Sequence, residues 1–72
     1  MKKKAAYTAV VQRSGKWWIG WLEEIQGVNA QARTKPQLMR DLRSALKEAL
    51  EMNREEALSA AGKQFEEVSV EL

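Results

Sequence analysis

The chain has 72 residues and a net charge of +2, and it contains neither cysteine nor histidine. A domain of this length buries only roughly 60% of the surface that its unfolded chain exposes, so its core must be small. The composition excludes disulfides and leaves no cysteine or histidine to bind a transition metal, so we expect one domain, residues 1–72, with no cofactor.

The first residues, 1–5, are expected to form a basic flexible arm that contains Lys2, Lys3 and Lys4. No apolar run follows them that is long enough for a signal peptide or a membrane span, which favours a cytoplasmic protein without a membrane partner. Up to Arg43 the chain carries nine basic and three acidic residues, and beyond it three basic and seven acidic residues. The interpretation that we favour is a solvated basic region beside an acidic C-terminal strand, and a nucleic-acid-binding surface is the alternative.

Residues 6–13 and 17–22 predict a β-hairpin, because β-branched, small and aromatic residues flank the turn-forming pair Ser14–Gly15. A two-residue turn at this pair places Ala9 opposite Gly20 and Tyr7 opposite Leu22. The face that we assign to the core carries Tyr7, Ala9, Val11, Trp18, Gly20 and Leu22. Because the residues at the centre of this face are small, we expect a helix to pack closely against it.

The opposite face of the hairpin carries too much apolar area for a single-layer sheet to leave in water. Its apolar residues are Val10, Trp17, Ile19 and Trp21. We predict that these four side chains form an interface, since aromatic side chains often dominate the binding energy of interfaces. Its occupant is a second copy of the chain, giving a dimer or tetramer, or the surface of a toxin, or stacked nucleic-acid bases.

A third, half-exposed strand is predicted at residues 28–33, where apolar and polar residues alternate after Gly27. Thr34 and Gln37 form a capping box with Pro36 in the first turn, so a long helix is expected to begin at residue 35. Its apolar stripe follows the helical period toward Gly62. A second capping box begins at Asn53, so this helix either breaks there or overhangs the shorter strands.

Residues 65–72 alternate between apolar and charged side chains, which predicts a fourth strand. A right-handed crossover through the helix would return this strand parallel to the first strand and beside it. The expected fold class is therefore α+β. In it, the elements follow the order βββαβ, a four-stranded mixed sheet has the order 3-2-1-4, and the helix packs on one face.

The sequence offers little for catalysis, because it has no histidine for general acid or base chemistry. The paired carboxylates Glu23–Glu24, Glu55–Glu56 and Glu66–Glu67 lie at a turn, a helix start and an edge strand, where we expect solvation or capping. We therefore predict no enzyme, no catalytic or metal site and no small-molecule substrate. The arm, Arg33 and Lys35 are candidate contacts to nucleic acid or to an acidic partner, unless their charge serves only solubility.

The segments Tyr7–Val11 and Trp17–Val28, followed by Thr34 at the start of a helix rich in leucine, alanine and glutamate, resemble the HicB family of type II antitoxins. In that family, a strand reading roughly Y-T-V-V leads to an aromatic-rich strand, then P-E-L-P-G-C, a short strand and a helix beginning T-x-E-E-A. Four positions match this pattern, namely Glu24, Ile25, Gly27 and Thr34. Three positions depart from the usual Pro, Pro and Cys, namely Glu23, Gln26 and Val28.

The resemblance implies a partial ribonuclease-H-like fold that binds and neutralises a small HicA-type toxin, an endoribonuclease that cleaves mRNA. Ribonuclease activity does not carry over, because no acidic residue lies within the first two predicted strands. Antitoxins of this family typically add a DNA-binding segment after the core, so direct DNA binding is expected only if another protein or the lysine arm supplies it. The alternatives are a nucleic-acid-binding protein that uses the basic N-terminal half with Trp17 and Trp21, and an orphan scaffold domain that associates with itself.

Overall fold

A computed structural model describes residues 6–70, which begin with a β-hairpin of β1 (Ala9–Ser14) and β2 (Trp17–Leu22). Ser14 lies opposite Trp17, so the turn consists of Gly15 and Lys16. Gly15 has φ = 62°, the left-handed backbone that favours glycine in two-residue hairpin turns. The predicted register is therefore wrong by two residues. Because the side-chain period of a strand is also two, every side chain nevertheless stays on its predicted face.

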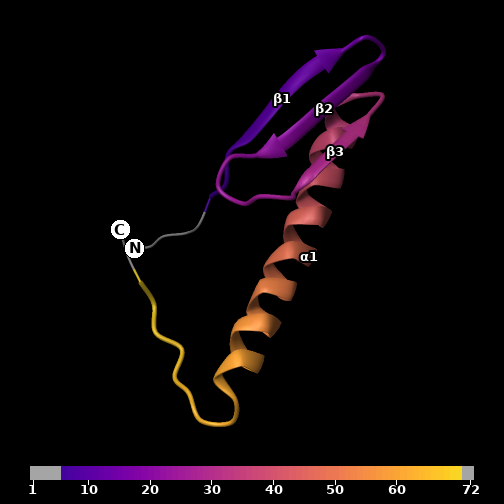
Figure 1. Ribbon diagram of the computed structural model, residues 1–72. Coiled ribbons are helices and arrows are strands. Elements are labelled where there is room, and N and C mark those ends of the chain that lie inside the picture. The colour runs from indigo at the N-terminus through magenta and orange to yellow at the C-terminus, as the bar shows by residue number, and fades with distance from the viewer. Residues whose placement is uncertain (1–5, 71–72) are drawn as a thin grey trace.

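The third strand, β3 (Asn29–Ala32), pairs antiparallel with β2 and completes a sheet of order β1-β2-β3 (Figure 1). It lies within the predicted range 28–33. The connection from β2 turns at Gly27, whose φ is 87°, and the Leu22 N–H donates to the Val28 carbonyl oxygen at 3.2 Å. This connection reverses the chain, so β3 lies antiparallel beside β2.

One long helix, α1 (Lys35–Ala61), crosses one face of the sheet and continues well beyond it (Figure 1). Thr34 caps its start, since the Thr34 Oγ1 accepts from the Gln37 N–H at 3.3 Å, and Gly62 ends it with φ = 81°. The helix is continuous through Asn53. Of the two predicted alternatives, the overhang is therefore found and the break is not.

The core lies between α1 and the inner face of β2 and β3. Its buried side chains are Leu22, Val28, Ala32, Leu38 and Leu42. Trp18 packs against this cluster, which confirms its assignment to the core side. Gly20 is buried at the point of closest approach, where a Cβ atom would lie 3.2 Å from both Leu38 Cδ2 and Leu42 Cδ1.

The predicted fourth strand is wrong as far as the structure describes it, because residues 65–70 form no strand and the sheet has three strands. The mixed four-stranded sheet of order 3-2-1-4 is therefore replaced by a three-stranded antiparallel sheet within an α+β fold. The continuous helix gives the physical reason. Residues 50–61 extend about 18 Å beyond Ala49, the last helical residue packed on the core, so segment 65–70 starts far from β1.

Candidate binding surface

The outer face of the sheet, opposite α1, brings together the four side chains predicted to form an interface. Trp21 lies between Val10 and Asn29 across the three strands, and Ile19 lies between Gln12 and Gln31. Trp17 follows at the hairpin end, opposite Ser14. We call Val10, Trp17, Ile19 and Trp21 the outer face.

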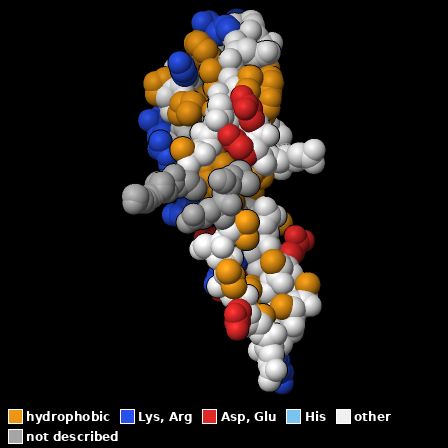
Figure 2. All heavy atoms as spheres, turned by 90° about the vertical axis from the view of Figure 1, so that its left-hand side faces the viewer, with side chains coloured by type: hydrophobic (Ala, Val, Ile, Leu, Met, Phe, Trp, Pro, Cys, Tyr) orange, Lys and Arg blue, Asp and Glu red, His pale blue; other side chains and the backbone are white. Residues whose placement is uncertain are grey.

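The outer face is partly open to solvent, although it contains the largest side chains of the sheet. Trp17 is 38% exposed and Trp21 is 40% exposed, whereas Val10 and Ile19 are half-buried. Figure 2 shows hydrophobic side chains at the surface of the sheet end of the molecule, with Lys and Arg side chains at its tip. Contiguous exposed apolar surface of this kind commonly marks an interaction site.

Cationic side chains flank two of the tryptophans. The Arg33 guanidinium lies 4.8 Å from the centroid of the Trp17 ring, which is within the range of a cation–π contact. Arg13 and Lys35 lie on the other side of the sheet, at 5.4 Å and 6.0 Å from the Trp18 ring. Of the predicted cationic contacts, Arg33 thus joins the outer face and Lys35 does not. Lys2, Lys3 and Lys4 lie outside the described residues.

Arg13 is a contact that sequence reasoning missed. The predicted register paired Arg13 with Lys16, whereas the observed register places it opposite Trp18. A turn centred on Gly15–Lys16, with glycine in the first position of the loop, would have been the sequence signal for this pairing.

At the opposite end of the hairpin, the Glu24 carboxylate and the Glu23 backbone N–H hold Thr8, the residue before β1. The Glu24 carboxylate accepts from the Thr8 backbone N–H at 2.9 Å and 3.1 Å, and the Glu23 N–H donates to the Thr8 carbonyl oxygen at 3.0 Å. The hydrogen bond from the Thr8 N–H lowers the pKa of Glu24 below its ordinary value of 4.5, because it stabilises the carboxylate. Glu24 therefore has a structural role, which is to hold Thr8 beside β2.

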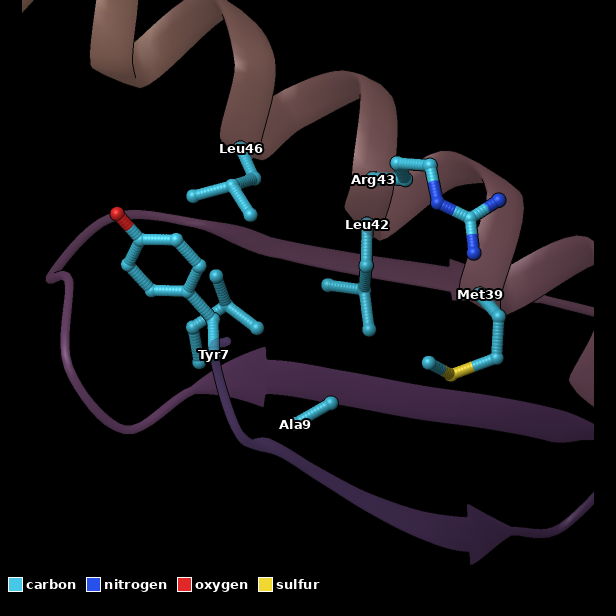
Figure 3. A pocket seen from close by; sticks show the side chains of 7 residues that line it. Tyr7, Ala9, Met39, Leu42, Arg43 and Leu46 are labelled. Atoms are coloured by element: carbon cyan, nitrogen blue, oxygen red, sulfur yellow. The ribbon is translucent and has the colours of Figure 1, made fainter. Parts of the chain in front are cut away.

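A small groove of about 160 Å³ lies between β1 and α1, because α1 packs mainly on β2 and β3 and covers the inner side of β1 only in part. Its lining is mostly apolar and consists of Tyr7, Ala9, Leu22, Met39, Leu42, Arg43 and Leu46. In Figure 3, Tyr7 lies near Leu46 at one end, and Met39 and Arg43 lie at the other end, toward which β1 runs. The sequence did not predict this groove, because a fourth strand was expected beside β1.

Two further observations concern residues 6–70. In this part of the chain no group of three or more His, Cys, Asp or Glu side chains is arranged to hold a metal ion. The only helix there, α1, lacks the apolar length that crossing a membrane requires.

Comparison of the chain with protein-family models, with curated proteins and with solved structures finds no match.

Proposed function

We propose that the protein is a non-catalytic binding module of the HicB antitoxin type, which binds a small HicA-type endoribonuclease toxin in the cytoplasm and blocks its access to mRNA. The observation that carries this proposal is the outer face, on which Trp17 and Trp21 are each well exposed on a rigid sheet. The helix occupies the other side, and no element among residues 6–70 covers the outer face.

The physical chemistry of the outer face favours a protein partner. Tryptophan is strongly enriched among the residues that dominate interface energies, because a large rigid ring buries much area at little cost in conformational entropy. Trp21 lies on the central strand β2, which has hydrogen-bonded neighbours on both sides. Its position is therefore fixed before a partner arrives, which lowers the entropic cost of binding.

The order of the elements adds support to the antitoxin proposal. Residues 9–61 form three antiparallel strands followed by a helix, in the sequence that the resemblance to the HicB family implies for its first four elements. Thr34, one of the matching positions, caps the helix. A fold can be shared without the function, so the proposal depends on a binding test.

Co-expression with a HicA-type toxin provides that test. We expect the chain to restore growth and to co-purify with the toxin. The double variant Trp17→Ala/Trp21→Ala should weaken the complex at least about tenfold, since truncating an interface anchor typically costs about 2 kcal/mol or more. Met52→Ala is the control, because Met52 is 61% exposed on the overhanging part of α1 and away from the outer face. Toxicity that persists beside the soluble wild-type chain would contradict the proposal.

Binding of single-stranded nucleic acid is a second candidate, favoured by the Arg33 guanidinium that lies over the exposed Trp17 ring. An aromatic surface for base stacking beside a cation for phosphate is a recurring arrangement in single-strand binding. Anisotropy of a labelled single-stranded RNA should then rise on titration, and the affinity should fall steeply with salt. Arg33→Gln should reduce this salt dependence. Lack of binding at low salt would remove this candidate.

A further inference from the structure

The open edge of β1 has backbone groups that can pair with another strand. The Thr8 carbonyl oxygen accepts from the Glu23 N–H, so Thr8 faces β2. Hydrogen-bonding direction alternates along an antiparallel strand, and the N–H and C=O groups of Ala9, Val11 and Arg13 therefore point away from β2. Among residues 6–70, no strand pairs with this edge. Such an edge is a template for strand addition.

The groove makes this edge selective for apolar side chains. It lies beside β1, with Ala9 as its floor and Leu42 and Leu46 of α1 as its wall (Figure 3). A strand that added to β1 would direct alternate side chains into the groove and the others toward the side of the outer face. The added strand therefore needs apolar residues two positions apart.

Segment 65–70 has apolar residues two positions apart, and both are exposed to solvent. Val68 is 74% exposed and Val70 is 89% exposed, and Glu66 shares their side of an extended chain. Six extended residues span about 20 Å, which matches the six residues of β1. The exposed contact between Arg54 and Glu67, at 3.3 Å, offers little resistance to moving the segment.

Charge determines the direction in which this segment fits. Arg13, near the Ser14 end of β1, and Arg43, at the corresponding end of the groove, are basic, whereas Glu23 and Glu24 lie at the Ala9 end. An antiparallel strand places Glu66 at the basic end and the valines over Ala9 and Val11. A parallel strand would instead place Glu66 near Glu23 and Glu24. In Figure 1, α1 runs in the direction opposite to β1, so the chain's own segment 65–70, returning from the far end of α1, would approach β1 in the parallel and unfavourable direction.

We propose that residues 65–70 of a second copy of the chain add antiparallel to the β1 edge, and that the two copies exchange these segments reciprocally in a two-fold dimer. In this pairing Val70 lies opposite Ala9, Val68 lies opposite Val11, and Glu66 lies between Arg13 and Arg43. The surface used is the β1 edge with the groove, so the outer face remains free for the partner proposed above. The two proposals can therefore fail separately.

The oligomeric state of the full-length chain provides the first test, measured by analytical ultracentrifugation at micromolar concentrations. We expect a dimer for the wild type and a monomer for Val68→Asp/Val70→Asp, with the helical signal of α1 unchanged in the far-ultraviolet circular dichroism spectrum. Ser69→Asp is the matched control and should remain dimeric, because Ser69 points away from the groove in the proposed pairing. A wild-type monomer, or a dimer that survives the valine substitutions, would overturn the proposal.

A charge exchange tests the direction of pairing. Arg43→Glu and Glu66→Arg should each weaken dimerisation at least about tenfold, and the double variant should recover most of the loss. No recovery in the double variant would contradict the pairing of Glu66 with the basic end.

Disulfide formation distinguishes a second copy from the chain's own segment. The native chain has no cysteine, so Gln12→Cys and Glu67→Cys can be introduced singly into separate preparations. Gln12 and Glu67 lie directly opposite each other in the proposed antiparallel pairing, where Cβ atoms are close enough for a disulfide. Mixing the two preparations under oxidising conditions should give the mixed covalent dimer. An internal disulfide in a monomeric Gln12→Cys/Glu67→Cys variant would instead show that the segment folds back on its own chain.

Discussion

The two faces of the sheet are both apolar, yet only one is buried. The outer face has the larger side chains, with Trp17 and Trp21 each about two-fifths exposed, at 38% and 40%. The inner face has Gly20 at its centre, and α1 approaches so closely there that a Cβ atom would lie 3.2 Å from both Leu38 Cδ2 and Leu42 Cδ1. The comparison shows that the fit of the helix to a small residue determines which face becomes the core, rather than the amount of apolar surface.

The largest effect is expected at Leu38, a residue of α1 that is fully buried against the inner face of the sheet. Leu38→Ala should lower the free energy of unfolding by about 2–5 kcal/mol, through lost burial and the cavity that remains. Leu50→Ala is a matched control on the same helix, because Leu50 is 37% exposed, and it should cost about 1 kcal/mol or less. Urea unfolding followed by circular dichroism measures both losses. Equal losses would contradict a core confined to the sheet end of α1.

A smaller loss is expected for Gly20→Ala, which adds one methyl group to the closest contact of the inner face. The added Cβ would meet Leu38 Cδ2, Leu42 Cδ1 and the Val10 carbonyl oxygen, so α1 and the sheet must separate slightly. Overpacking of this kind typically costs about 1–3 kcal/mol. The double variant Gly20→Ala/Leu42→Val should lose less than the sum of the two single variants, since Leu42→Val removes part of the crowding. Strict additivity in urea unfolding would argue against this contact as the cause.

On the outer face, substitution should affect stability less than it affects binding. Trp17→Thr removes the contact with Arg33, which at an exposed site contributes about 0.5–1 kcal/mol, and keeps a residue suited to a strand. We therefore expect a loss of about 1 kcal/mol in thermal or urea unfolding. If Trp17→Thr destabilised the chain as strongly as Leu38→Ala, the outer face would be part of the core and the contrast between the faces would fail.

The smallest expected effect is the acid sensitivity contributed by Glu24. Its pKa is lowered in the folded state by the hydrogen bond from the Thr8 N–H, so its stabilising effect is present above the unfolded pKa. This contribution is lost as the pH falls from about 4.5 through the lower folded pKa. Glu24→Gln should therefore narrow the difference in stability between neutral and acidic pH. Glu48→Gln, on an exposed position of α1, is the control.

The sequence predicted the parts of the fold whose signals are local. Thr34 and Gln37 predicted the helix start, and the alternation along β2 assigned Trp18 and Gly20 to the inner face. The register was wrong because Ser14–Gly15 and Gly15–Lys16 are both plausible two-residue turns, and a shift of two preserves every face. The residues on each face of the hairpin were therefore predictable even where the pairing was not.

The fourth strand failed for a different reason. Asn53 and Glu56 have the pattern of a capping box, but the residues from Arg54 to Leu58 are mostly strong helix formers, and continuing a helix adds a hydrogen bond at each residue. Alternation at Val68 and Val70 indicates a capacity to form a strand, and it does not identify the edge that would receive it. The groove is open because no strand among residues 6–70 pairs with the open edge of β1. The sequence predicted a strand there, so it did not predict the groove.

The overhang of α1 makes the connection to segment 65–70 a tether of adjustable length. Residues beyond Ala49 have little tertiary packing, so this end of the helix should unwind more readily than the end above the sheet. Each residue that leaves the helix lengthens the tether from about 1.5 Å to as much as about 3.4 Å. Slow amide hydrogen exchange near Leu38 and fast exchange toward Ala61 would show that the far end of α1 unwinds more readily. The same helix can thus hold the sheet firmly at one end and extend the reach of the chain at the other.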